Sequence, residues 1–153
     1  MSRAFVKETD SDPVGFPDRP ISPHRNLVTE AGLAGIEAAL ERFETTRRNA
    51  EDTGNREAAG AALREVRYWK ARRASAEVVK TPEDKSRASF GMTVTLRGED
   101  GRKQSFQIVG EDEADPSHGT ASCVSPLARA VLTHGAGDTV VIADSEAVLL
   151  EIR

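Results

Sequence analysis

The chain of 153 residues lacks most features that mark membrane, secreted or metal-cluster proteins. No segment approaches the roughly 18 consecutive apolar residues that a membrane-spanning helix needs. The single cysteine, Cys123, excludes an internal disulfide and a zinc site built from several thiolates. Residues 1–16 lack the continuous apolar stretch of a secretory signal, so we expect a cytoplasmic protein.

Excess positive charge and aromatic side chains are also missing. The formal net charge is −4, which argues against broad, sequence-independent binding to DNA. Aromatic residues make up only 5% of the chain, and its three histidines, His24, His118 and His134, lack metal-ligand spacing. No glycine-rich phosphate loop is present. We therefore expect no catalytic residues, no bound metal, no cofactor and no small-molecule substrate.

Proline is concentrated near the N-terminus. Four of the seven prolines are Pro13, Pro17, Pro20 and Pro23, and the apolar residues around them follow no regular period. Proline without a core-forming pattern is typical of an extended, poorly ordered segment. We therefore predict that residues 1–26 form a flexible arm.

Residues 27–80 have the pattern of two amphipathic helices. The first has Thr29 as a suitable N-cap and apolar residues three or four apart at Leu33, Ile36, Leu40 and Phe43. Asparagines and Gly54 interrupt the period over residues 49–56, and a second helix is predicted from about residue 56 to 79. Its expected inward-facing residues are Ala59, Leu63, Val66, Trp69 or Lys70, and Ala76. A short connection makes the two helices antiparallel, which predicts a helical hairpin of the coiled-coil type.

Residues 81–153 form the C-terminal part of the chain. It begins with a charged linker at residues 81–85, after which apolar and polar residues alternate as they do in short strands. Strands at 93–96 and 105–109 flank a hairpin turn, and further strands are predicted at 120–124, 139–142 and 147–152. Between them, Ser125 is a suitable N-cap and Pro126 a suitable first residue of a short helix. The predicted fold class is α+β, with a helical hairpin followed by a small, mostly antiparallel sheet carrying one short helix.

Four segments of this C-terminal part resemble the C-terminal domain of the GreA/GreB transcript cleavage factors. They read FGMTVTL at residues 90–96, FQIVGEDEAD at 106–115, SPLARA at 125–130 and GD at 137–138. Their order and spacing match the family over residues 88–153. The resemblance implies an FKBP-like fold for this part, preceded by a coiled-coil hairpin.

The same resemblance implies a partner and a docking surface. In Gre factors the C-terminal domain docks at the rim of the secondary channel of bacterial RNA polymerase, and the hairpin enters the channel. The family's docking helix corresponds to Ser125, Pro126 and Arg129 in this sequence. The alternative for these residues is a well-capped helix that only supports the core.

The predicted hairpin tip departs from the family. There the tip reads D-L-S-E-N-A-E-Y, and its first Asp and the Glu three positions later help to hold a catalytic Mg²⁺ of the polymerase, an ion that prefers oxygen ligands. The tip of this chain contains Glu51, Asp52, Asn55 and Glu57. Asp52 matches the family's Asp, but the neutral Asn55 stands where the family has Glu, and Arg56 beside it opposes a cation.

The predicted helices are also short. Helices of about 20–24 residues reach about 30–36 Å, and about ten fewer residues per helix than in the family means a shortfall of about 15 Å. A metal ligand misplaced by ~1 Å already loses most of its effect. We therefore expect an RNA polymerase-binding elongation factor with weak or no stimulation of transcript cleavage, which competes with cleavage factors or alters pausing.

The sequence is also compatible with other interpretations. A polymerase-binding protein like the regulator of nucleoside diphosphate kinase also has a short hairpin. An FKBP-type prolyl isomerase is disfavoured because residues 81–153 contain only two aromatic residues, Phe90 and Phe106. The basic second helix, with Tyr68 and Trp69 among its arginines, suggests transient contact with nucleic acid in the elongation complex, although most basic helix faces are simply solvated.

Two smaller features have simple structural explanations. The acidic segment at residues 111–115 lacks the glycine and the distal glutamate of a calcium-binding loop, so we predict a solvated loop. Cys123 lies beside Val124 in an expected strand, where a cysteine behaves as a small buried apolar residue. Neither feature predicts a catalytic group.

Overall fold

A computed structural model describes residues 16–153 and divides them between two compact units. The first unit consists of residues 16–22 and Ile36–Ala74, and the second of Pro23–Gly35 and Ser75–Arg153. Most of the predicted flexible arm, residues 1–15, lies outside the described part of the chain. Among residues 16–153, no helix has the length and apolar character needed to cross a membrane.

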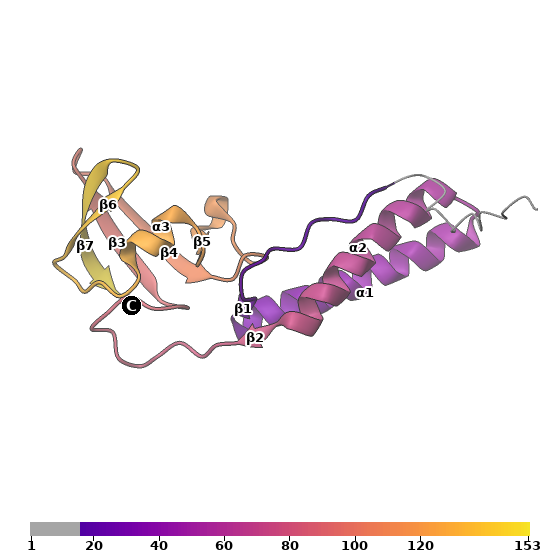
Figure 1. Cartoon of the computed structure of the whole chain (residues 1–153), viewed down its shortest axis with the longest axis horizontal. Coiled ribbons are helices and arrows are strands. Elements are labelled where there is room, and N and C mark those ends of the chain that lie inside the picture. Colours follow the sequence, from indigo (N-terminus) through magenta and orange to yellow (C-terminus); the bar gives the residue numbers. More distant parts are fainter. Residues whose placement is uncertain (1–15) are drawn as a thin grey trace, which may run out of the picture. The chain divides into compact units, whose positions relative to one another are not determined.

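Two helices form the predicted hairpin (Figure 1). Helix α1 is Glu30–Asp52 and helix α2 is Arg56–Ser75. The connection is shorter than the predicted interruption over residues 49–56, because α1 continues to Asp52 and only three residues separate the helices. Gly54 adopts a φ of 70° in this turn, a left-handed conformation that glycine reaches without strain.

The buried faces of the two helices differ from one another. On α1 the predicted positions Ile36 and Leu40 are buried, together with two alanines. On α2 the prediction is correct for Val66, and of the two alternatives Trp69 and Lys70 it is Trp69 that is half-buried, whereas Lys70 is exposed. The other buried positions of α2 are Gly60, Ala62 and Arg72. Glycine and alanine add little to an apolar period, so the sequence pattern did not reveal this face of α2.

A two-stranded parallel sheet joins the segments at the base of the hairpin. Strand β1 is Leu27–Val28 and strand β2 is Glu77–Val78. The amide of Glu77 donates to the carbonyl of Asn26 at 2.8 Å. The predicted extension of the second helix to residue 79 is therefore wrong: α2 ends at Ser75, because the next residues pair with the chain that leads into α1.

A five-stranded sheet forms the rest of the second unit (Figure 1). The order of its strands is β5-β4-β3-β7-β6, and only the β4–β5 pair is parallel. This confirms the predicted mostly antiparallel sheet and the α+β class. The strands are β3 (Thr93–Gly98), β4 (Lys103–Val109), β5 (Thr120–Ser122), β6 (Thr139–Ile142) and β7 (Ser145–Ile152).

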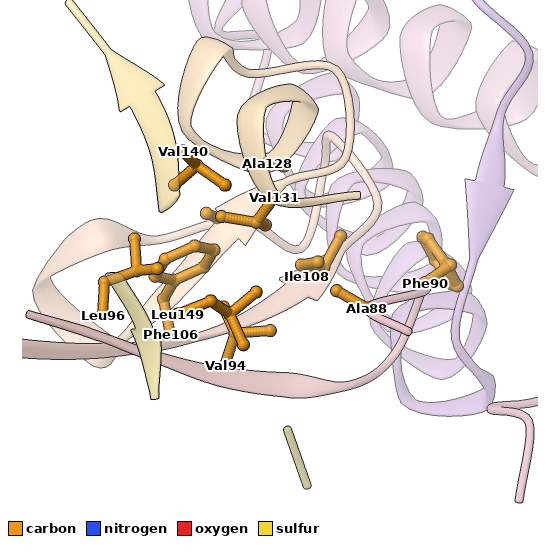
Figure 2. Close-up of a cluster of buried hydrophobic side chains, with 11 residues drawn as sticks. Ala88, Phe90, Val94, Leu96, Phe106, Ile108, Ala128, Val131, Val140 and Leu149 are labelled. Atoms are coloured by element: carbon orange, nitrogen blue, oxygen red, sulfur yellow. The ribbon is translucent and has the colours of Figure 1, made fainter. Parts of the chain in front are cut away.

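The core of this unit lies between the sheet and the short helix α3, Pro126–Val131. Ala128 and Val131 of α3 are completely buried and point toward side chains of the sheet (Figure 2). Val94 from β3 and Leu149 from β7 are also completely buried in this cluster. A helix of only six residues is too short to be stable alone, so its packing on the sheet is what holds it in place.

Candidate functional site

The start of α3 is fixed by its own sequence. The Ser125 hydroxyl accepts a hydrogen bond from the amide of Ala128 at 3.2 Å, which confirms the predicted N-cap. Pro126 occupies the first helical turn, where its missing N–H leaves no bond unmade. The amide of Arg129 then donates to the carbonyl of Ser125 at 3.0 Å. Serine and proline together therefore fix the position and direction of the first turn.

The structure brings the three predicted docking residues together on this turn. Pro126 and Arg129 are exposed and Ser125 is half-buried, whereas Ala128 and Val131 on the other side of α3 are buried. The apolar face of α3 therefore supports the core, while its outward face presents a proline and a cation to solvent. Support of the core leaves these outward side chains accessible to a partner.

A groove of about 330 Å³ lies beside the start of α3. The sequence predicted strands and a helix at these positions but did not indicate that a groove would form between them. Residues from β4, β5 and the loop before β5 surround it. They include Phe106, Pro116, Ala121, Ser125 and Leu127. The lining is largely apolar and includes Ser125, the first of the predicted docking residues.

Cys123 lies close to this region and is only half-buried, which is less than the sequence suggested. Burial raises the pKa of its thiol, and the nearby Glu111 carboxylate raises that pKa further. The thiol is therefore protonated at neutral pH. This environment does not suit a nucleophile, which requires a lowered pKa.

The acidic loop after β4 is partly structural, so the prediction of a solvated loop is wrong for Glu113. The Glu113 carboxylate accepts a hydrogen bond of 2.6 Å from the Thr29 hydroxyl. That hydroxyl in turn accepts one of 2.9 Å from the amide of Gly32, which confirms Thr29 as the N-cap of α1. A carboxylate beside a helix N-terminus also interacts favourably with the helix dipole.

Asp115, at the end of the same loop, caps the short 3₁₀ helix η1, Pro116–His118. Its carboxylate accepts a hydrogen bond from the amide of Ser117 at 3.0 Å. The Ser117 hydroxyl and the His118 ring hold the pKa of Asp115 below its usual value. The acidic residues Glu113 and Asp115 therefore stabilise the base of the hairpin and the loop before β5.

The four predicted tip residues, Glu51, Asp52, Asn55 and Glu57, are all exposed around the turn between α1 and α2. The side-chain oxygen of Asn55 accepts a hydrogen bond from the amide of Ala58 at 3.1 Å, so Asn55 is the N-cap of α2. Its own amide donates to the carbonyl of Ala50 at 2.9 Å. The residue in place of the family's second acid is therefore engaged in holding the turn. Within residues 16–153 no group of three or more acidic, histidine or cysteine side chains is placed to hold a metal.

Replacing Asn55 with alanine should destabilise the hairpin by about 1 kcal/mol, because one N-terminal amide of α2 loses its capping partner. Asn55→Asp keeps an oxygen acceptor at the same position and should unfold close to the original protein. Urea unfolding followed by circular dichroism measures the difference. Equal stability of the alanine and aspartate variants would show that the cap contributes nothing.

The sequence is similar to that of known transcription factors. Residues 83–152 match the family model "Transcription elongation factor, GreA/GreB, C-term". The transcription elongation factor GreA of Thioalkalivibrio sulfidiphilus is 34% identical over 113 residues, which cover 72% of this chain and 71% of that protein. The chain therefore belongs to the GreA/GreB family.

Other relatives match over shorter stretches. GreA of Anaeromyxobacter sp. is 43% identical over 82 residues, 52% of this chain and 48% of that protein. GreA of Methylobacterium nodulans is 50% identical over 56 residues, 36% of this chain and 35% of that protein. In these two matches the chain spans less than half of the relatives' own length. Among solved structures, the GreA factor homolog 1 (Gfh1) protein of Thermus thermophilus is 19% identical, with a TM-score of 0.40 over 85% of this chain and 99% of that one.

Proposed function

We propose that this protein is a transcription elongation factor of the GreA/GreB type that binds bacterial RNA polymerase in the cytoplasm. Its sheet unit docks at the rim of the secondary channel, and its hairpin enters the channel without strongly stimulating transcript cleavage. The observation that carries the proposal is the outward face of α3 within the matched residues 83–152. In this family, that helix is the docking element.

The geometry of α3 suits a docking surface. Its N-cap and first-turn proline fix the helix end before any partner binds, so little conformational entropy is lost on binding. Arg129 offers an exposed cation on the outward face. An acidic patch on the partner would complement this cation, and the neighbouring apolar groove would receive an apolar side chain.

The geometry of the tip argues against metal-assisted cleavage. Helices of 23 and 20 residues have lengths of about 30–35 Å. The oxygen of Asn55 already accepts the amide of Ala58, and amide oxygen carries no charge to offset that of Mg²⁺. We therefore propose that the hairpin occupies the channel and competes with cleavage factors or alters pausing.

The alternatives receive less support. The family match favours the GreA/GreB type over a protein like the regulator of nucleoside diphosphate kinase. The groove beside α3 has only one aromatic residue in its lining, Phe106, whereas prolyl isomerase chemistry uses an aromatic cleft. Transient contact with nucleic acid would involve the arginine-rich face of α2 and belongs to the same proposal.

Binding to core RNA polymerase tests the docking proposal directly. Ser125→Glu combined with Pro126→Ala removes the cap and puts a negative charge beside Arg129. We expect affinity to fall by about tenfold or more, as when a central interface residue is lost. The measurement is a binding titration of labelled protein with core polymerase. Undiminished affinity would contradict docking through α3.

Two controls separate docking from folding. Ser145→Glu introduces the same change at an exposed position at the start of β7 and should leave the affinity unchanged. Arg129→Glu reverses an exposed charge without touching the cap, so it should weaken binding while the unfolding midpoint stays close to the original. Loss of binding in all three variants would indicate a general surface-charge effect instead.

A further inference from the structure

Residues 17–19, here called the N-terminal strap, lie along α2 (Figure 1). The carbonyl of Pro17 accepts a hydrogen bond from Nε of Arg64 at 2.7 Å. The Asp18 carboxylate accepts one from Arg67 at 3.2 Å. This part of the predicted flexible arm is therefore held against the hairpin. Two neighbouring residues of the strap each accept a hydrogen bond from an arginine on the same face of α2.

Arg19 completes the contact in a different way. Its guanidinium lies 3.6 Å from the centre of the Tyr68 ring and 5.7 Å from that of Trp69. The same guanidinium pairs with the Glu65 carboxylate at 2.7 Å. A planar cation over an aromatic face, fixed by an ion pair at its edge, is a specific arrangement. The strap thus engages the charged and aromatic side chains of this face within two helical turns.

The strap covers a face of α2 that carries Arg64, Arg67 and Tyr68. Cationic and aromatic side chains grouped in this way are suited to binding another molecule. The strap contacts differ in exposure: the side chains of Asp18 and Arg67 are 69% and 49% exposed, whereas those of Arg19 and Glu65 are 31% and 21% exposed. Exposed ion pairs contribute little stability and weaken in salt. The strap is therefore held by a small set of specific contacts, of which only the Arg19 group is half-buried, and a set this small can be released.

We infer that the strap is an autoinhibitory element, which must leave α2 before this face of the hairpin can contact the polymerase. The inference rests on the proposed function, because it concerns access of the hairpin to the same partner. When the binding-competent state is only partly populated, the measured affinity falls in proportion to that population. A small number of such contacts would keep the strap closed in most molecules without preventing its release.

The state of the strap can be measured in the free protein. Trp69 is the only tryptophan of the chain, so its fluorescence reports on this face alone. Asp18→Ala combined with Arg19→Ala removes the side-chain contacts of the strap in the full chain: the two ion pairs with Arg67 and Glu65 and the cation–π contacts with Tyr68 and Trp69. We expect the emission of Trp69 to shift to longer wavelength as water reaches the ring. Arg25→Ala, which removes an exposed ion pair with Glu77, should leave the emission unchanged.

Polymerase binding then tests inhibition. The strap double variant should bind core polymerase about fivefold more tightly than the original protein, and a chain lacking residues 1–22 should show the same gain. Raising the salt concentration should shift Trp69 emission in the original protein toward that of the variant. Arg25→Ala should show neither the gain in affinity nor the change in emission.

The outcomes distinguish the two proposals. Equal or weaker polymerase binding by both strap variants, with the original protein still binding, would overturn autoinhibition and leave docking through α3 intact. An unchanged Trp69 emission in the double variant would overturn the inference as well, since it would show that the strap does not cover this face. Failure of every variant and of the original protein to bind polymerase would overturn both proposals.

Discussion

Gly110→Ala should destabilise the sheet unit by about 2–3 kcal/mol, because the backbone leaves no room for the added methyl group. A Cβ atom at Gly110 would lie 2.3 Å from the carbonyl oxygen of Leu27. That oxygen belongs to the backbone of β1, so it cannot rotate away as a flexible side chain could. Either β1 or the loop after β4 must move, and this loop also supplies Glu113 to the start of α1. Urea unfolding measures the change.

Gly35→Ala is the matched control and should act in the opposite direction. Gly35 lies inside α1, and no heavy atom comes within 4 Å of the position that a Cβ would occupy. Alanine is favoured over glycine in a helix, so we expect a gain of about 0.5–1 kcal/mol. If both substitutions changed stability by the same amount, the close approach of β1 to Gly110 would be wrong.

Transcript cleavage in backtracked complexes should remain close to the intrinsic rate of the polymerase when this protein is added. We expect a rate on the order of 100-fold below that reached with a cleavage-competent GreA, because a misplaced ligand loses this much. Asp52 alone cannot replace a pair of carboxylates, and Asn55 is engaged as a helix cap. The measurement is the rate of RNA shortening in assembled backtracked complexes.

Variants of the tip sharpen this prediction. Asp52→Asn should have no effect on the slow cleavage, since no metal depends on that carboxylate. Asn55→Glu restores the second acid of the family's motif but not the length of the hairpin, so it too should remain slow. Robust cleavage that disappears with Asp52→Asn would refute the proposed loss of activity, and a large gain with Asn55→Glu would show that length is not limiting.

The sequence was most informative where side-chain periodicity and turn residues agree. Alternation around β3 and β4 placed the sheet hairpin correctly, and Ser125 followed by Pro126 located the start of α3. The same residues carry the resemblance to the GreA/GreB family. Local rules therefore predicted the fold class and the start of α3, whereas the candidate docking residues came from the family resemblance.

The features that the sequence missed depend on contacts between distant segments. Strands of two residues, such as β1 and β2, are too short to show a period, and their pairing joins positions 27 and 77. The strap contacts between residues 17–19 and α2 look in sequence like an ordinary proline-rich segment. The cap formed by Asn55 could have been recognised, because asparagine just before a helix is a common N-cap.

The most direct test of the account is a competition experiment on backtracked elongation complexes with a cleavage-competent GreA. If this protein occupies the same channel without supplying metal ligands, increasing amounts should slow GreA-stimulated cleavage toward the intrinsic rate while adding no cleavage of their own. The Ser125→Glu, Pro126→Ala variant should compete poorly. GreA-stimulated cleavage that stays constant at saturating concentrations of this protein would contradict docking at the secondary channel.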